Sequence, residues 1–309
     1  MIDLKDLKFE NMAGLVERAA SAPPVTVAVA GAGDRLVLES VATLAREGLL
    51  KALLFGDRAE ISPMLDEVGM PATCCEVRHQ PDVSGAALAA AVAAGAGEAQ
   101  LLMKGFVPTR IFLRAVLVDT AGLLTGRLLS HLALYDVPGY DRLLGMTDGG
   151  INIAPDFTDR VEIVRNACEA GERIWPESPR VALVAAVEKV QSNMPVTMEW
   201  AAISQMARRG EFGDVVVDGP LGLDNALSPE AMRFKGIQSP VGGRADILVV
   251  PDLQAGNLVG KAMTYLAGAP MAGLVLGARV PVILNSRADQ VKARVASLLA
   301  ARPMLDFSG

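Results

Sequence analysis

A serine and an arginine near the C-terminus have the types and the spacing of an anion-binding site. The β-rich run at residues 282–284 is typical of a strand, and Ser286 and Arg287 follow it where a last helix is expected over residues 289–301. Free N–H groups and the positive end of the helix dipole favour an anion at a helix start. The guanidinium of Arg287 would add a forked pair of donors suited to phosphate. The segment therefore predicts a site for a phosphate-bearing ligand.

The same segment also has the pattern of a helix cap. Ser286-x-x-Asp289 before an apolar helix matches a capping box, in which the two side chains satisfy N–H groups of the first turn. The two interpretations are compatible, because a serine that caps a helix can also line a site.

Two later loops carry polar side chains directly after β-rich runs. Asp218 closes the run DVVVDGP, and Asp224 and Asn225 follow it in the same loop; Asn257 and Lys261 follow the run DILVV. Ligands of α/β folds bind beyond the carboxyl ends of parallel strands. Although Asp, Gly and Pro are ordinary turn residues, two such loops together predict that these side chains bind substrate.

A third group lies earlier in the chain. Lys104 ends a β-rich run, and Thr109 begins a helix that carries Arg110 and Arg114. Positions 110 and 114 are one turn apart and share a face. This face is either part of a binding site or a solvated basic edge, since exposed arginine is the common case.

The elements that must position these side chains alternate along the sequence. Helical segments separate β-rich runs at residues 25–30, 52–55, 73–77, 101–103, 181–185, 214–217, 247–250, 274–276 and 282–284. This alternation is typical of βαβ units. A Gly- and Pro-rich stretch at 124–155 breaks it, so we place a change of domain near its start. The prediction is an α/β protein with a discontinuous first domain, residues 1–125 plus 284–309, and a second domain, residues 126–283.

Composition supports this fold class and excludes several functions. Of the 309 residues 51% are hydrophobic but only 4% aromatic, which suits two α/β domains with mostly parallel sheets covered by helices on both faces. The net charge of −6 and the lack of an evident basic face argue against nucleic acid as a partner. No run is long enough to span a bilayer and the N-terminus lacks a signal peptide's apolar core, so we expect a cytoplasmic protein without a membrane partner.

Cofactor motifs are also incomplete. Three cysteines and two histidines form no zinc pattern. The Gly31-Ala32-Gly33 turn lacks the third glycine of the dinucleotide fingerprint, because Leu36 stands there, and it is best interpreted as a tight strand-to-helix turn. We expect neither a metal nor a nicotinamide.

The C-terminal two thirds resemble the phosphate acetyl/butyryl transferase family. The similarity lies in DGPLGLDNALSPEA, in KGIQSPVGGRADILVVPDLQAGNLVGK and in LAGAPMAGLVLGARVPVILNSRADQ, and it extends back to GFVPTRIFLRAVL, so that it covers roughly residues 100–300. The resemblance implies two three-layer α/β domains like those of isocitrate and isopropylmalate dehydrogenases, with the active site in the cleft between them. It also implies a homodimer.

The implied reaction converts acyl-CoA and inorganic phosphate into acyl phosphate and CoA, with coenzyme A as a substrate and no cofactor. Ser286 and Arg287 match the family's Ser-Arg pair, which is proposed to hold the phosphate and the developing oxyanion. Arg114 matches the arginine of a Thr-x-x-x-Leu-Arg pattern that begins at Thr109. The acetyl branch has a catalytic aspartate seven residues after the serine, where this chain has Ala293. Asp289 is the nearest carboxylate and our candidate base.

The sequence Ser-Arg-Ala-Asp at residues 286–289 is similar to that of the butyryl branch of the family and favours a butyryl or branched C4 acyl group. The alternatives are a phosphate acetyltransferase of the same family and a catalytically silent relative that binds CoA. A dehydrogenase of the same fold would need a nicotinamide site and paired metal-binding carboxylates, and the sequence offers neither.

Overall fold

The structure is a computed structural model that describes residues 3–7 and 9–306. The chain divides into two compact units: unit 1 comprises Met1–Arg127 and Met271–Gly309, and unit 2 comprises Leu128–Pro270. The chain returns to unit 1 at Met271, earlier than residue 284, where the sequence placed the boundary. Strand β10 (Met271–Leu276) belongs to unit 1 because it pairs antiparallel with β11 (Val282–Ile283) and packs against the last helix.

Unit 1 is built on a mostly parallel sheet. Its strands in order are β3 (Cys75–His79), β2 (Leu50–Gly56), β1 (Val25–Ala30), β4 (Leu101–Lys104), β11 and β10. All neighbours except β10 and β11 run parallel. Four of these strands are almost wholly apolar and buried, as expected for strands covered on both faces.

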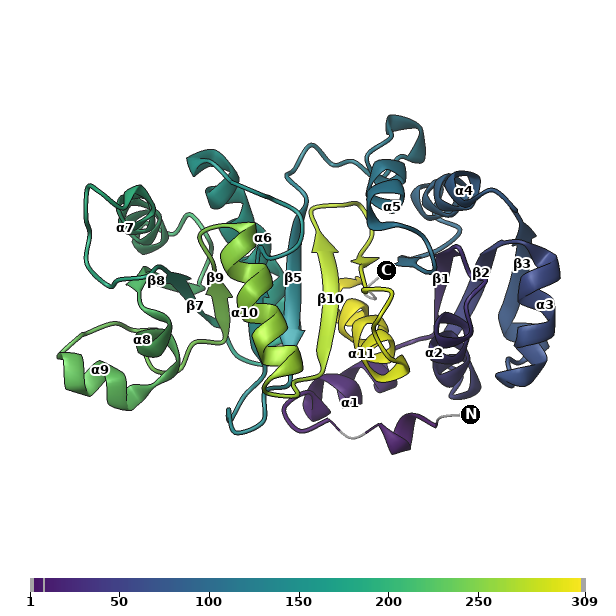
Figure 1. Ribbon diagram of the computed structural model, residues 1–309, viewed down its shortest axis with the longest axis horizontal. Helices are drawn as coiled ribbons and strands as arrows, with labels where there is room; N and C mark the ends of the chain where they lie inside the picture. Colours follow the sequence, from purple (N-terminus) through teal and green to yellow (C-terminus); the bar gives the residue numbers. More distant parts are fainter. Residues whose placement is uncertain (1–2, 8, 307–309) are drawn as a thin grey trace. The chain divides into compact units, whose positions relative to one another are not determined.

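Helices cover both faces of this sheet. They are α1 (Ala13–Ser21), α2 (Arg35–Arg46), α3 (Arg58–Glu67), α4 (Val83–Gly95), α5 (Thr109–Val116) and α11 (Val291–Ala301), with short 3-10 helices at Leu4–Asp6, Ala72–Cys74, Asp119–Ala121 and Arg302–Met304. Helix α2 packs against α11 and α4 against α5, and Figure 1 shows these pairs on opposite sides of the strands. The alanine-rich sequence of α4 permits close packing, since six of its alanines are buried.

The loops after β1 and β4 are in direct backbone contact. The N–H of Gly105 donates to Ala30 O (2.8 Å) and that of Phe106 to Gly31 O (2.7 Å). Gly31 has φ +70°, and a Cβ on Gly105 would collide with the backbone of Gly31. Glycine is therefore required at both positions, and the Gly31-Ala32-Gly33 segment is a tight turn.

Unit 2 has a mixed sheet. Its strands in order are β5 (Ser130–Tyr135), β6 (Leu144–Thr147), β9 (Ile247–Val249), β7 (Arg180–Val184) and β8 (Val216–Leu221). Strands β5 and β6 form an antiparallel pair, and the other neighbours are parallel. The Gly- and Pro-rich segment that breaks the βαβ alternation thus supplies two short strands of its own.

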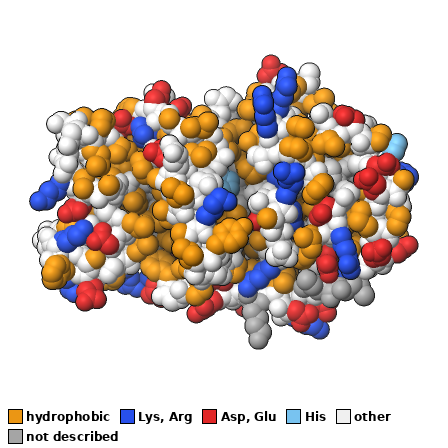
Figure 2. Space-filling model, viewed as in Figure 1, with side chains coloured by type: hydrophobic (Ala, Val, Ile, Leu, Met, Phe, Trp, Pro, Cys, Tyr) orange, Lys and Arg blue, Asp and Glu red, His pale blue; other side chains and the backbone are white. Residues whose placement is uncertain are grey.

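The helices of unit 2 are α6 (Phe157–Ile174), α7 (Pro195–Arg208), α8 (Leu223–Leu227), α9 (Pro229–Lys235) and α10 (Leu253–Tyr265). In Figure 1, α7 lies on one side of β7 and β8, and α8 and α9 lie on the other. Hydrophobic side chains gather over α10 and the elements beside it in Figure 2, in agreement with the exposure of Leu258, Tyr265 and Leu266.

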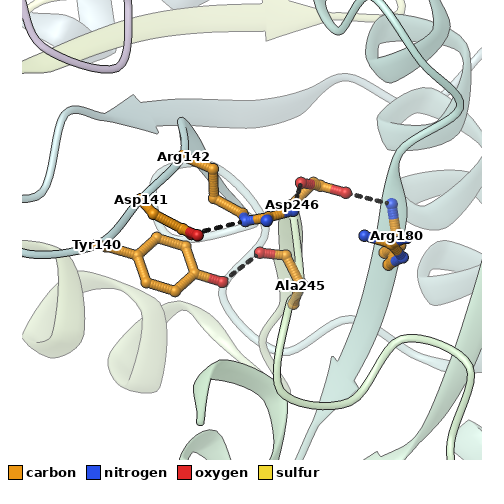
Figure 3. Close-up of polar contacts among 6 residues, drawn as sticks. All are labelled: Tyr140, Asp141, Arg142, Arg180, Ala245 and Asp246. Atoms are coloured by element: carbon orange, nitrogen blue, oxygen red, sulfur yellow. Dashed lines mark hydrogen bonds and ion pairs between the residues drawn. The ribbon is translucent and has the colours of Figure 1, made fainter. Parts of the chain in front are cut away.

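A polar network fixes the loop between β5 and β6 at the amino ends of the parallel strands (Figure 3). Asp246, just before β9, accepts from the N–H of Arg180 (2.8 Å) and pairs with Arg142 (3.2 Å). The hydroxyl of Tyr140 donates to Ala245 O (2.8 Å), and burial raises the pKa of Tyr140 to about 12. Because ligands bind at the opposite, carboxyl ends of such strands, we interpret this network as structural.

Across residues 3–7 and 9–306, no helix is both long and apolar enough to cross a bilayer. Within the same residues, no group of three or more His, Cys, Asp or Glu side chains is arranged to hold a metal ion.

Candidate active site

The carboxyl ends of the parallel strands of unit 1 bring several predicted site residues together. Lys104 is the last residue of β4, and the segment from Ser286 to Asp289 follows the neighbouring strand β11. Charge interactions connect the Lys104 amine to Arg294, Arg287, Asp289 and Asp34. Three of the residues singled out in the sequence, Lys104, Arg287 and Asp289, therefore belong to one cluster.

The segment from Ser286 to Asp289 forms a closed turn. The N–H of Asp289 donates to Ser286 O (3.1 Å), and the Asp289 carboxylate accepts from the N–H of Ser286 through Oδ2 (2.8 Å). Asn285 donates to the same oxygen through Nδ2 (3.1 Å). These bonds leave Oδ1 of Asp289 without a hydrogen bond from the residues that the structure describes.

The last helix begins later than the sequence suggested. Helix α11 starts at Val291 with Gln290 as its N-cap, so the expected start at Asp289 is wrong, and Ser286 lies in the preceding turn. The reason is that Asp289 O accepts from the side chain of Arg294 (3.2 Å) instead of a helical N–H. One arm of the predicted capping box is present, since the Asp289 carboxylate binds the Ser286 N–H, but it closes the turn and does not cap the helix.

Ser286 and Arg287 are both exposed at this turn. The Arg287 guanidinium makes no hydrogen bond with the described residues, so its donors are open to a ligand. An exposed arginine on a fixed backbone, next to a serine hydroxyl, can bind phosphate or stabilise an oxyanion.

Lys104 is buried, with 1% of its surface exposed. Its Nζ donates to the carbonyls of Gly105 (3.3 Å) and Val107 (3.2 Å). Burial, together with the charges of Arg294 and Arg287, lowers the pKa of this amine to about 8. Lys104 therefore carries a proton that is lost far more easily than that of a solvated lysine.

Sequence reasoning missed Arg294 and Asn285, both of which hold the turn. Arg294 is 1% exposed and bonds the carbonyls of Ser286, Arg287 and Asp289, and its pKa is lowered by burial. Asn285 also donates to Ser297 Oγ (3.0 Å). A signal for Arg294 existed, because its position falls on the buried face that the spacing of Val291 and Val295 defines.

Thr109 and Arg114 lie on helix α5, at its first residue and in its last turn. Both are exposed, and no hydrogen bond or ion pair of the described residues connects either side chain to the turn. Their assignment as site residues stays a prediction.

Asp224 and Asn225 of unit 2 are held by a lysine that the sequence did not single out. Lys235 pairs with Asp224 (2.9 Å), which lowers the pKa of that carboxyl, and donates to Asn225 Oδ1 (3.3 Å). Lys235 also pairs with Glu188 (3.5 Å). Lys235 thus binds both carboxylates and the Asn225 side-chain oxygen, whereas the buried Asn225 Nδ2 has no hydrogen-bond partner among the described residues.

Asp218 lies inside strand β8 and not after its end, in contrast to the sequence interpretation. Its carboxylate accepts from Ser239 Oγ (2.7 Å) and pairs with Arg208 (3.4 Å). The strand continues through Gly219 and Pro220 because β8 is the last strand of this sheet, and a proline is tolerated in an edge strand.

Asn257 and Lys261 lie one turn apart on the exposed surface of α10. The Lys261 amine is 6.0 Å from the centroid of the Tyr265 ring. No hydrogen bond or ion pair within the described part of unit 2 connects Asn257 or Lys261 to Asp218 or Asp224.

Known proteins of one family resemble the chain. Residues 70–301 match the family described as "Phosphate acetyl/butaryl transferase". A phosphate butyryltransferase of Clostridium beijerinckii is 39% identical over 298 residues, covering 95% of this chain and 99% of the relative. A phosphate acetyltransferase of Rhizobium meliloti is 43% identical over 282 residues, covering 91% of this chain and 89% of the relative.

The fold agrees with these sequences. The crystal structure of a branched-chain phosphotransacylase from Enterococcus faecalis superposes with a TM-score of 0.79 at 31% identity, covering 90% of this chain and 98% of that one. Sequence and fold together confirm what the C-terminal motifs predicted: the chain belongs to the phosphate acetyl/butyryl transferase family.

Proposed function

We propose that the protein is a phosphate acyltransferase that moves a short acyl group between coenzyme A and inorganic phosphate. The observation that carries the proposal is the turn from Ser286 to Asp289. It presents an exposed Arg287 beside a serine hydroxyl and Oδ1 of Asp289, and neither the guanidinium nor Oδ1 has a hydrogen-bond partner among the described residues. This cluster suits a phosphate-bearing substrate, and membership of the family supports the reaction.

The chemistry assigns a role to each group of the turn. Towards acyl phosphate, a phosphate oxygen gives its proton to Oδ1 of Asp289 and attacks the thioester carbonyl, the C–S bond breaks, and CoA leaves as a thiolate that takes the proton from Asp289. In reverse, the CoA thiol, mostly protonated at neutral pH, gives its proton to Oδ1 of Asp289 and attacks the carbonyl carbon of the acyl phosphate; the C–O bond to phosphate breaks, and phosphate leaves with the proton. Arg287 and the Ser286 hydroxyl would stabilise the tetrahedral oxyanion.

Residues beyond the turn are proposed to bind the rest of the substrates. In unit 1 we assign a catalytic role to Arg114, and phosphate or CoA contacts to Thr109 and Lys104. In unit 2 we assign them to the polar side chains Asp218, Asp224, Asn225, Asn257 and Lys261.

We propose a butyryl or branched C4 group as the preferred acyl chain. The sequence Ser-Arg-Ala-Asp at residues 286–289 supports this assignment, and the relatives include a phosphate butyryltransferase and a branched-chain phosphotransacylase. Acetyl is the second candidate, because the relative from Rhizobium meliloti is an acetyltransferase at 43% identity.

Phosphate-dependent release of free CoA from a panel of acyl-CoAs tests the function and the chain length together. We expect butyryl-CoA or isobutyryl-CoA to exceed acetyl-CoA in kcat/KM. A tenfold higher kcat/KM for acetyl-CoA, equivalent to about 1.4 kcal/mol, would overturn the C4 assignment but would not affect the assignment to the family. Binding of CoA without any phosphate-dependent release would identify a catalytically silent relative.

We also propose that the reaction needs no metal or nicotinamide, and that the protein acts as a cytoplasmic homodimer. Turnover should survive exhaustive dialysis against EDTA and should not change on addition of NAD. Turnover that is lost with EDTA and restored by one divalent ion would show that the site requires a metal. Light scattering after gel filtration tests the dimer.

A further inference from the structure

Two buried arginines of unit 1 bind backbone carbonyls, but in different surroundings. Arg302 and Arg294 are each 1% exposed. Arg302 donates through all three of its nitrogens, to the carbonyls of Ala19, Leu49, Ala22 and Pro23, and so ties α1 and the start of β2 to the end of the chain. A purely structural arginine is expected to be fully satisfied in this way.

Within residues 3–7 and 9–306, the side chain of Arg294 makes hydrogen bonds only to the turn. Its Nε donates to Asp289 O (3.2 Å), and one terminal nitrogen donates to Ser286 O (3.1 Å) and more weakly to Arg287 O (3.5 Å). These are the three residues to which the proposed reaction assigns its chemistry. Arg294 touches them through their backbone, so it controls where their side chains are placed.

The second terminal nitrogen of Arg294, Nη1, is buried and has no hydrogen-bond partner in the part of the chain that the structure describes. An unpaired buried donor costs free energy, and burial already lowers the pKa of this guanidinium. Placing it near Lys104, a second buried cation, adds repulsion that only Asp289 and Asp34 oppose. The arrangement disfavours stability locally, which is typical of a residue retained for a site.

We propose that Arg294 is a positioning residue of the active site, which fixes the turn from Ser286 to Asp289 so that Arg287 and the Asp289 carboxylate meet the substrates in one geometry. The inference rests on the proposed phosphate acyltransferase function. A guanidinium is needed because its planar fork reaches carbonyls on both sides of the turn, which a single ammonium cannot do.

The first test compares Arg294→Met and Arg294→Lys with the matched variants Arg302→Met and Arg302→Lys. We expect kcat/KM of folded Arg294→Met to fall about 100-fold, the usual cost of a small misplacement of reacting groups. Arg294→Lys should fold and keep only part of the activity. The Arg302 variants should unfold more easily, yet keep the kcat/KM of the wild type per folded molecule. Added guanidinium should restore part of the activity of Arg294→Ala and leave that of Arg302→Ala, per folded molecule, unchanged.

A second measurement separates this inference from the proposed function. Hydrogen exchange at the amides of Ser286 and Asp289, both bonded within the turn, should be faster in Arg294→Met and Arg294→Lys and unchanged in the Arg302 variants. Unchanged exchange together with unchanged kcat/KM would refute the positioning role. If the wild type releases no CoA with phosphate, the proposed function fails, and faster exchange in the Arg294 variants would still establish that Arg294 holds the turn.

Discussion

The two units carry charged side chains in and after their parallel strands, and these side chains are used differently. In unit 2, Asp218 and Asp224 are both paired, with Ser239 and Lys235 respectively. In unit 1, Arg287 has no ion pair with any described residue, and the cations around it bind backbone carbonyls. Charges that satisfy one another stabilise a surface, whereas open charges on a backbone held by buried groups are available to a ligand.

The two units also differ in the electrostatics of these charged groups. The unit 1 cluster contains two buried cations, Lys104 and Arg294, whose pKa values are lowered by burial and which repel each other. In unit 2 the partner of Asp224 instead lowers that carboxyl's pKa, so the ionised pair is favoured. Unfavourable electrostatics that persist in a folded protein are typical of functional sites, which points to unit 1 as the source of the reacting groups.

Replacing Asp289 tests this comparison most strongly. Asp289→Asn keeps an oxygen that can accept from the Ser286 N–H, but it cannot take a thiol proton. We expect kcat to fall about 1,000-fold, within the range for loss of a general base. Asp214→Asn is the control in unit 2, because this exposed carboxylate has no assigned role, and the variant should retain most activity. Near wild-type turnover in Asp289→Asn would place the base elsewhere, with Asp218 and Asp224 the next candidates.

Removing the open arginine should have the next largest effect. Arg287→Ala deletes a donor to phosphate or to the oxyanion, and we expect kcat/KM to fall about 100-fold, as for other single transition-state donors. The fold should be unaffected, because the side chain is exposed and makes no hydrogen bond with the described residues. Arg209→Ala removes an exposed arginine of unit 2 and serves as the control. Equal kcat/KM in the two variants would contradict the site.

The lowered pKa of Lys104 should make the free energy of unfolding depend on pH. The folded pKa of about 8 lies below the unfolded value of about 10.4, so between these values the unfolded chain binds more protons. The contribution of Lys104 to the free energy of unfolding should therefore rise with pH across this window, by at most about 1.4 kcal/mol per pH unit. Lys104→Met should flatten this part of the profile, measured by urea unfolding from about pH 7 to pH 10. If the wild type and Lys104→Met had parallel profiles of stability against pH, the pKa of the Lys104 amine would not be lowered in the folded protein.

The smallest effect is expected at the paired carboxylate of unit 2. Asp224→Asn removes an exposed ion pair with Lys235 but keeps an oxygen that can accept a hydrogen bond from the substrate, so we expect kcat/KM to fall only about twofold. The pair's stabilisation is present above the ordinary aspartate pKa and is lost as the pH falls through the lowered folded value. A tenfold or greater loss of kcat/KM would show that unit 2 contributes directly to the reaction and would weaken the contrast between the units.

Much of the architecture was predictable from local patterns. The runs at residues 25–30 and 247–250 became β1 and β9 almost unchanged, because a short apolar β-branched run between turns has few other outcomes. The motif around Ser286 identified the family and the candidate turn. The residues that form each of these patterns lie close together in the sequence, so the patterns can be recognised without knowledge of the fold.

Tertiary structure decided the details that matter for chemistry. The start of α11 moved to Val291 because the Arg294 side chain, one turn into the helix, takes the carbonyl of Asp289. Lys104 became a buried cation beside Arg294 only because β4 pairs with β11, far away in sequence. Asp224 became a partner of Lys235 through the packing of two short helices. The sequence by itself determines residue types and local propensity, whereas burial and charge pairing depend on which distant segments the fold brings together.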